Sequence, residues 1–254
     1  MKRAVVTGGS GGIGKIIAKA LHDNGFEIIL VARNEENLKK AAPEIGTNVK
    51  TFPCDVTSYT HVESLFANFD KIDVLVNSAG ILGPTETLAD SDIANWKRVL
   101  EVNLIGTVNC CKAAGPILEK SEHGKIVNIA GGGAAYARPL HSAYATSKAG
   151  VVRFTEELSL ELKNTDVNVI APGAHNTKLW EDEKVDEPPE QWANPEDVAK
   201  LVLYLASEKS NGITGKFIHI KDDYESFTPE LSKSDKCALR RVDDILLEKL
   251  KNEL

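Results

Sequence analysis

The sequence predicts an α/β protein with one doubly wound, seven-stranded parallel sheet. Short apolar runs rich in Val and Ile alternate with segments of helical period along most of the 254 residues. These runs are nearly continuous in apolar residues, as is typical of parallel strands covered on both faces. We find no repeat, low-complexity block or linker between two cores. We therefore predict a single domain over residues 1–220, followed by a C-terminal extension over residues 221–254.

Strands and helices are predicted in regular alternation. The expected strands cover residues 4–7, 28–31, 49–52, 74–76, 125–129, 167–170 and 216–220. The expected helices cover residues 13–21, 93–118 and 143–162, with others beginning at residue 35, around residue 62 and at Pro195. Because parallel strands need a crossover connection, this alternation indicates a parallel sheet with helices on both faces.

Charge and composition exclude several classes of function. With 30 basic and 37 acidic residues the net charge is −7, so the chain lacks the positive field that holds nucleic acid. No apolar run approaches the roughly 20 residues that span a membrane. The first residues lead directly into a strand pattern rather than into the apolar stretch of a signal peptide, so we expect a cytoplasmic protein. The four cysteines and six histidines show no ligand spacing, which predicts buried thiols and no metal site.

A glycine-rich loop, TGGSGGIG at residues 7–14, connects the first expected strand to the first expected helix. Two spacings fit it, G-x-G-x-x-G from Gly9 and G-x-x-x-G-x-G from Gly8, and the sequence does not choose between them. Either lets backbone amides at a helix N-terminus approach a pyrophosphate, whereas the alternative is a plain flexible turn. The candidate contacts to a dinucleotide are Gly8, Ser10, Gly11, Gly12, Ile13 and Gly14.

Arg33 stands at the end of the second expected strand, where folds that prefer NAD usually carry an acid for the ribose hydroxyls. A guanidinium can instead hold a 2′-phosphate through paired donors. We therefore expect NADP as the preferred cofactor, with NAD as the alternative. In the competing explanation Arg33 only solvates the edge of the sheet.

Tyr144 and Lys148 lie four residues apart in the helix expected over residues 143–162, and they therefore share one helix face. An ordinary tyrosine titrates at about 10 and transfers protons poorly at neutral pH. A neighbouring ammonium favours the phenolate, so we expect Lys148 to lower the pKa of the Tyr144 phenol. Alone, such a pair is also found on surface helices.

These features and four further landmarks make the chain resemble the short-chain dehydrogenase/reductase family over residues 2–220. The landmarks are Asp55 and Val56 after the third strand, NSAG at residues 77–80, Asn103 within VNLIG, and Pro172 and Gly173 with Thr177. The resemblance implies a Rossmann-type fold and an NAD(P)-dependent oxidoreductase that interconverts a secondary alcohol and a ketone.

The resemblance also implies roles for the matching residues. Tyr144 would be the acid or base at the substrate oxygen, Lys148 would tune it and bind the nicotinamide ribose, and Asn103 would position a proton-relay water. The residues implied to line the rest of the cofactor are Asp55, Val56, Asn77, Ala79, Gly80, Pro172, Gly173 and Thr177. Outside this context residues 77–80 would form a turn, and Asn103 a helix cap or kink.

One position departs from the family pattern. The family usually carries a serine thirteen residues before the tyrosine, and Gly131 stands there. Loss of such a hydrogen-bond donor typically costs about 10²–10³ in rate. The alternative function is therefore a catalytically weak regulatory protein that binds a dinucleotide. Ser142 is the nearest other hydroxyl, and we expect it to cap the following helix rather than to replace the serine.

Glycines at residues 131–133 leave room for a wide ring, and family members with a similar stretch occur among sugar-processing enzymes. We therefore expect a sugar or a nucleotide-linked sugar as substrate. The residues expected to border it are Gly131, Arg138, His141, His175 and Lys178. The expected lid, residues 174–194, carries an acidic run at residues 181–190. We expect that run to form a solvated, mobile flap; as a recognition element it would disfavour a diphosphate.

The extension repeats apolar residues at three- and four-residue steps, namely Leu239, Val242, Leu246 and Leu250. This spacing predicts an amphipathic helix. We expect it to dock on its own or a neighbouring subunit of a homodimer or homotetramer. In the alternative, it is a charged finger that reaches the substrate site of a partner subunit.

Overall fold

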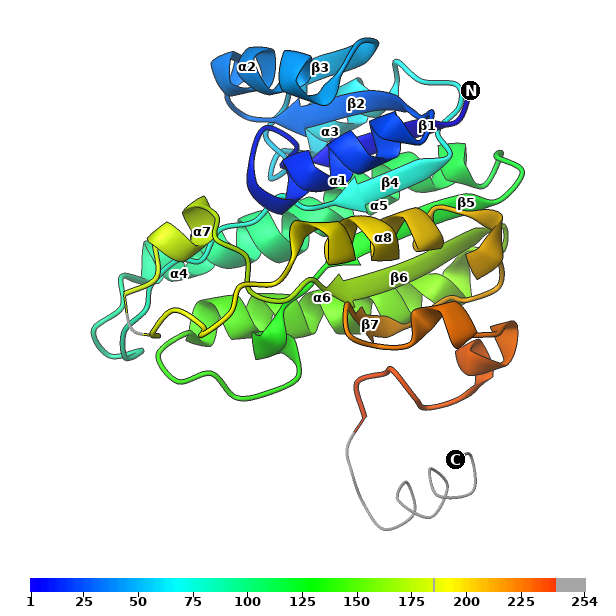
Figure 1. Ribbon diagram of the computed structural model, residues 1–254. Coiled ribbons are helices and arrows are strands. Elements are labelled where there is room, and N and C mark those ends of the chain that lie inside the picture. The colour runs from blue at the N-terminus through cyan, green and yellow to red at the C-terminus, as the bar shows by residue number, and fades with distance from the viewer. Residues whose placement is uncertain (185, 241–254) are drawn as a thin grey trace.

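In the computed structural model, which describes residues 1–184 and 186–240, seven parallel strands form one sheet between two layers of helices (Figure 1). The strands are β1 (Arg3–Thr7), β2 (Glu27–Ala32), β3 (Val49–Pro53), β4 (Val74–Asn77), β5 (Gly124–Ile129), β6 (Thr165–Ala171) and β7 (Phe217–His219). Their order is β3-β2-β1-β4-β5-β6-β7, so the strand order reverses between β1 and β4. The prediction of a doubly wound, seven-stranded parallel sheet is confirmed.

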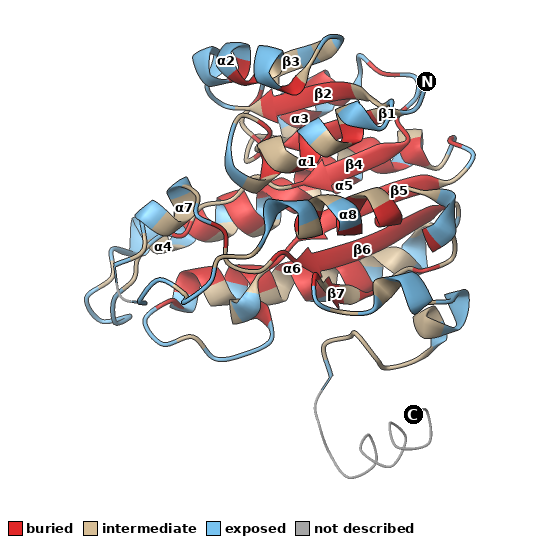
Figure 2. Ribbon diagram, in the orientation of Figure 1, coloured by how far each residue is buried: buried red, intermediate tan, exposed pale blue. Residues whose placement is uncertain are grey.

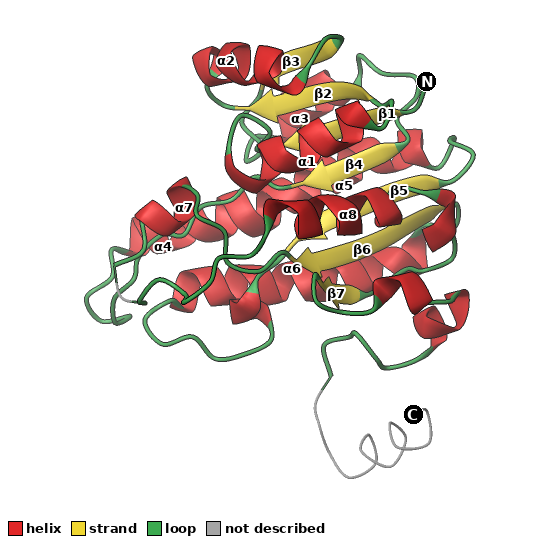
Figure 3. Ribbon diagram, viewed as in Figure 1, coloured by secondary structure: helices red, strands yellow, loops and turns green. Residues whose placement is uncertain are grey.

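Helices cover both faces of this sheet (Figure 3). One layer contains α1 (Gly12–Asp23), α2 (Glu35–Ile45) and α8 (Pro195–Leu205), and the other contains α3 (Tyr59–Phe66), α5 (Gly106–Leu118) and α6 (Ser142–Glu161). The strands are buried along most of their length (Figure 2), which explains their nearly continuous apolar sequences. No described helix is long and apolar enough to cross a membrane.

The helix expected over residues 93–118 is divided into three parts. It begins as α4 (Ile93–Leu100), widens into a π-helical segment, Glu101–Ile105, and continues as α5. Such wide turns are rare and are often found at functional sites. Here the wide turn contains Asn103, whose side chain is hydrogen-bonded away from the helix.

The chain after β7 returns along the outside of the sheet. Residues 234–240, which we call the strap, run beside β7 and α6. The Nζ atom of Lys216 donates to the carbonyl oxygens of Ser234 at 2.7 Å and Lys236 at 3.1 Å. The Glu156 carboxylate accepts from the backbone N–H of Leu239 at 2.7 Å and from Nη1 of Arg240 at 3.1 Å.

The segment between β7 and the strap packs on the same core as the sheet, through Tyr224, Phe227 and Leu231. A division of the chain at residue 220 therefore stays a prediction. The amphipathic helix predicted from Leu239 to Leu250 lies, apart from residues 239 and 240, outside the described residues.

Candidate functional site

A cavity of about 970 Å³ opens at the carboxyl ends of the strands, where the strand order reverses between β1 and β4. In open α/β sheets this is where ligands bind, because the loops on either side of the reversal diverge. The sequence-predicted residues that line the cavity are Gly8, Ser10, Gly11, Gly12, Ile13, Gly14, Arg33, Asp55, Val56, Ala79, Gly80, Gly131, Arg138, Tyr144, Lys148, Pro172, Gly173, His175, Thr177 and Lys178. Asn77, Asn103 and His141 are not part of its lining.

The glycine loop leaves its backbone open to the cavity. A Cβ on Gly11, which precedes α1, would find no atom within 4 Å other than those of its chain neighbours, so the space beside this residue is open. Gly8 and Gly12 have φ angles of +66° and +51°, which favour glycine. A Cβ on Gly14 would lie 2.4 Å from the carbonyl oxygen of Gly8. The loop therefore fits a pyrophosphate, with backbone amides and the positive end of the helix dipole facing it.

Arg33 lies at the far end of the cavity, just after β2, and is exposed. Among residues 1–184 and 186–240, no side chain pairs with its guanidinium. The nearby carboxylate of Asp55 is engaged elsewhere: Thr57 donates to it from its backbone N–H at 3.0 Å and from its hydroxyl at 2.8 Å, and Arg98 lies 3.3 Å away. Burial raises the pKa of Asp55, but the Thr57 hydrogen bonds and the Arg98 charge outweigh it and hold the pKa below its usual range.

Tyr144 and Lys148 meet at the other end of the cavity. Both lie on α6, and Nζ of Lys148 stands 5.7 Å from the centroid of the Tyr144 ring and donates to the carbonyl oxygen of Ile129 at 2.8 Å. That hydrogen bond connects α6 to the end of β5, so the sheet fixes the position of the Lys148 ammonium beside the phenol. Both residues are less than a tenth exposed.

Burial governs the ionisation of this pair. It raises the pKa of Tyr144 and lowers the pKa of Lys148 to about 8, because a buried site disfavours the charged form of each group. The positive charge that lowers the pKa of Tyr144, and so opposes the effect of burial, is the guanidinium of Arg138 rather than the ammonium of Lys148. The expectation that Lys148 lowers the pKa of Tyr144 is therefore corrected for the protein on its own.

Gly131 stands directly against the phenol. A Cβ placed on it would lie 3.1 Å from Oη of Tyr144, so a serine there would bring its hydroxyl beside the reacting oxygen. Ser142 does not take up this position or cap α6. It is the first residue of that helix, and its Oγ accepts a hydrogen bond from Nε1 of Trp96 at 3.0 Å. The capping expectation is wrong, because the helix begins one residue earlier than a cap at Ser142 requires.

Asn103 supports residues around the cavity through hydrogen bonds, although it does not line the cavity itself. Its amide oxygen accepts from the backbone N–H of Ile81 at 2.8 Å, and its amide nitrogen donates to the Ile81 carbonyl oxygen and to Oγ of Ser147, each at 3.0 Å. Sequence reasoning missed Ser147, although it lies between Tyr144 and Lys148 in the motif. Its hydroxyl donates to the Tyr144 carbonyl oxygen at 2.7 Å and thus joins Asn103 to α6. The relay water expected at Asn103 stays a prediction.

Two expected site residues are turned away from the cavity. The side chain of Asn77 is buried and donates to Oδ1 of Asn128 at 2.9 Å, so it connects β4 to β5, and its expected contact to the cofactor stays a prediction. His141 is fully buried, with Nε2 2.8 Å from the Glu183 carboxylate. His175 lines the cavity, but Nε2 lies 2.8 Å from the Pro172 carbonyl oxygen, and burial lowers its pKa.

The acidic run of the lid is not uniformly solvated. The side chain of Glu183 is only 1 % exposed and pairs with Arg138, as does Asp186. The expectation of a solvated flap is therefore wrong for Glu183, whereas Asp186 is ion-paired but stays exposed. The acidic composition of the segment could not predict these ion pairs, because Arg138 lies more than forty residues earlier in the sequence.

Residues 2–188 match the family model of the short chain dehydrogenases. The nodulation protein G of Rhizobium sp. (strain N33) is 34% identical over 233 residues, which cover 86% of this chain and 95% of that protein. A solved structure of an actinorhodin polyketide ketoreductase with NADPH is 30% identical, with a TM-score of 0.79 over 89% of this chain and 98% of that chain. An NAD⁺-bound xylitol dehydrogenase is 29% identical, with a TM-score of 0.79 over 86% of this chain and 97% of that chain.

These matches agree with the geometry of the cavity: a glycine loop before α1, an exposed arginine after β2, and a phenol and an ammonium on one face of α6. The chain belongs to the short-chain dehydrogenase family and is an oxidoreductase that acts on CH–OH groups with a nicotinamide dinucleotide.

Proposed function

We propose that this enzyme interconverts a secondary alcohol and a ketone, with Tyr144 as the acid and base at the substrate oxygen. The observation that carries the proposal is that the phenol and the Lys148 ammonium share one cavity with the glycine loop. The runner-up, a regulatory protein without useful catalysis, rests only on the missing serine. The family match and the assembled pair favour the enzyme.

A bound nicotinamide ring supplies or accepts the hydride. Tyr144 takes the alcohol proton as the carbonyl forms, and it returns that proton when the ketone is reduced. Lys148 is the proposed donor to the nicotinamide ribose, and the charge that favours the phenolate is that of Arg138. Pro172, Gly173 and Thr177 follow β6 and line the same end of the cavity, so they are the proposed contacts to the nicotinamide.

The decisive test of this function is Tyr144→Phe. We expect the substitution to abolish turnover of alcohols and ketones, followed by the absorbance of reduced nicotinamide, because the ring keeps its shape but loses the transferable proton. Dinucleotide affinity, measured by fluorescence titration, should stay within a factor of about two, because the phenol hydroxyl is proposed to serve the substrate. Full turnover by the variant would refute the assigned role.

NADP is the proposed preferred cofactor. The exposed guanidinium of Arg33 lines the cavity without an ion pair among the described residues, which supports a contact to a 2′-phosphate. Loss of one charge-assisted hydrogen bond costs about 1.5–3 kcal/mol, or roughly 10- to 150-fold. We therefore expect Arg33→Ala to lower kcat/KM for NADP by that factor and leave kcat/KM for NAD nearly unchanged. Equal losses with both cofactors would contradict the preference.

The proposed substrate is a neutral sugar or polyol rather than a nucleotide-linked sugar. A Cβ on Gly132 would meet nothing within 4 Å, so the reacting end has room for a ring. Arg138, one of the two cations expected to border the substrate, already pairs with Glu183 and Asp186. The name of the matched xylitol dehydrogenase is consistent with a polyol. Assays should compare polyols, sugars, nucleotide sugars and an apolar ketone; good turnover of the apolar ketone alone would exclude this substrate class.

A further inference from the structure

Four ionisable side chains join the loop before α6 to the lid, and we call them the ion cluster: Arg138, His141, Glu183 and Asp186. Nη2 of Arg138 donates to Oε2 of Glu183 at 2.6 Å, and its Nε donates to Oδ2 of Asp186 at 2.7 Å. One guanidinium therefore holds two acids of the lid. Such charge-assisted contacts are short and directional, so they fix the position of all three groups.

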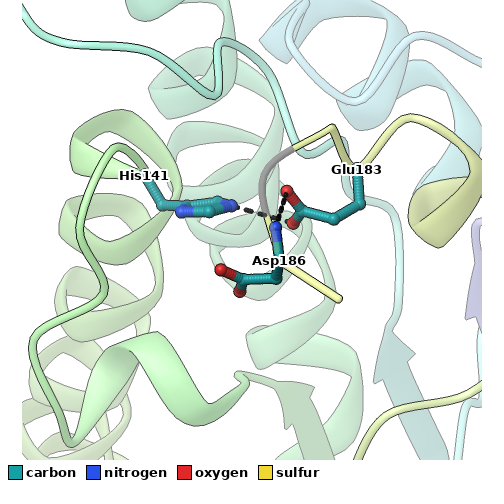
Figure 4. A group of neighbouring side chains, drawn as sticks. All are labelled: His141, Glu183 and Asp186. Carbon is teal, nitrogen blue, oxygen red and sulfur yellow. Dashed lines mark hydrogen bonds and ion pairs between the residues drawn. The ribbon is translucent and has the colours of Figure 1, made fainter. Parts of the chain in front are cut away.

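The ion cluster is buried where it meets α6. Figure 4 shows the imidazole of His141 directed at the Glu183 carboxylate, with Nε2 2.8 Å from Oε2. The other ring nitrogen, Nδ1, lies 2.6 Å from the carbonyl oxygen of Pro139. Both nitrogens face acceptors, so the ring satisfies both contacts only when each carries a hydrogen. His141 and Arg138 thus both contact Oε2 of Glu183, which connects the imidazole to the guanidinium.

Arg138 brings the charge of the ion cluster to the phenol of Tyr144. The Cζ atom of Arg138 stands 5.9 Å from the centroid of the Tyr144 ring, about as close as the Lys148 ammonium. Its charge opposes the effect of burial on the pKa of Tyr144. The position of the lid therefore bears on the ionisation of the phenol, since the lid acids determine where the guanidinium lies.

We propose that Arg138 is a positioning residue for the reaction, and that Glu183 and Asp186 hold its guanidinium against Tyr144 when the lid covers the cavity. This inference rests on the proposed role of Tyr144. The effect of Arg138 differs from that of the serine expected at position 131: a fixed cation favours the phenolate form of Tyr144, whereas the serine would donate to the substrate oxygen.

A bound divalent cation is the competing occupant of the ion cluster. His141, Glu183 and Asp186 each offer one ligand atom, and these atoms lie within 4.8 Å of one another. The guanidinium, however, already takes an oxygen of each carboxylate, so a cation would have to displace Arg138. The structure therefore favours the arginine, and the experiment includes a chelation arm.

The first arm measures Tyr144 directly. Tyrosinate absorbance is titrated in the wild type and in Arg138→Gln, and the curve of the matching Tyr144→Phe variant is subtracted from each. Without the guanidinium we expect Tyr144 to ionise about one pH unit higher, as removal of a nearby opposite charge predicts. Arg138→Lys keeps a charge and should restore most of the shift. Identical titrations of the wild type and Arg138→Gln overturn the proposal.

The second arm asks whether the lid acts through Arg138. We expect Glu183→Gln to lower kcat about tenfold without changing KM for the dinucleotide, as one loosened electrostatic contact predicts. The double variant Arg138→Gln/Glu183→Gln should be no slower than Arg138→Gln alone. Glu181→Gln is the matched control: it removes a negative charge from the exposed start of the same segment and should leave kcat unchanged. Additive losses in the double variant overturn the coupling.

The chelation arm separates the cation from the arginine. Turnover that falls on exhaustive chelation and returns with Mg²⁺ or Zn²⁺ overturns the proposal, whereas turnover indifferent to chelation supports it. If the wild type turns over no alcohol or ketone with either cofactor, the proposed function fails. The tyrosinate titration still tests Arg138 in that case, because it requires no substrate.

Discussion

Gly131 stands where the resemblance to the family predicts a serine, and the structure shows what a side chain there would meet. The missing side chain would have stood 3.1 Å from Oη of Tyr144, closer than side-chain carbons normally approach. A glycine there gives the phenol more room and removes a donor. The phenol consequently depends more on the charge of Arg138 beside it than on a hydroxyl neighbour.

Gly131→Ser is expected to raise kcat about tenfold or more, although by less than the ~10²–10³ that such a donor typically contributes. The new hydroxyl would lie beside the substrate oxygen, but its Cβ forces Tyr144 to move by a few tenths of an ångström. Gly131→Ala controls for the added carbon. Equal kcat values for the two variants, measured with the same alcohol, would show that the hydroxyl contributes nothing.

Lys148→Met is expected to stabilise the fold while abolishing turnover. Burial lowers the pKa of Lys148 to about 8, below its unfolded value of about 10.4. At pH 7 the folded state must therefore hold an ammonium in an unfavourable site, and its removal should raise the free energy of unfolding by about 1–3 kcal/mol. Urea unfolding from pH 7 to 10 tests this. The advantage of the variant should shrink above pH 8, because the wild type then loses its charge; a constant difference would contradict the cause.

At the scale of elements, the sequence predicted every strand and the main helices, because apolar runs and helical periods are local signals. It did not predict the π-helical segment Glu101–Ile105. That wide turn contains Asn103, whose amide pairs with both backbone groups of Ile81, twenty-two residues away. The π-helical segment therefore occurs together with a contact to a distant loop. The spacing of apolar residues in the segment does not indicate that contact.

Asn103→Ala should loosen the loop after β4. The side chain is buried and makes three hydrogen bonds, so its removal leaves buried partners unsatisfied and should cost about 2–3 kcal/mol in the free energy of unfolding. We also expect weaker dinucleotide binding, because the same loop carries Ala79 and Gly80 against the cavity. The exposed Asn95 on α4 provides the matched control, Asn95→Ala. Comparable losses in both variants would refute a specific bracing role.

At the scale of the whole molecule, the switch between β1 and β4 explains why the site residues could be predicted from motifs. The landmarks lie far apart in the sequence, yet most of them follow a strand, and a parallel sheet brings the carboxyl ends of its strands together. The ion cluster could not be predicted in this way. It joins two loops beyond the sheet, and loop conformation follows from tertiary contacts rather than from periodicity.

Deletion of residues 241–254 tests the expected role of the extension while leaving the Arg240–Glu156 pair in place. If the extension docks as structure in a homodimer or homotetramer, the mass in solution should fall, and any loss of activity should accompany that fall. Light scattering and the absorbance assay measure both. Loss of activity with an unchanged mass would favour the finger that reaches a partner's substrate site.

The strap has a consequence for how the protein behaves at high concentration. The backbone N–H of Phe217 in the last strand donates to the carbonyl oxygen of Cys237 at 2.7 Å, so the outer margin of the sheet is already occupied by its own chain. An uncovered strand margin is a template on which foreign strands stack and aggregate. Residues 234–240 thus cover the edge strand β7. A truncation that removes them should make the protein aggregate and precipitate on storage, whereas the full chain should stay in solution.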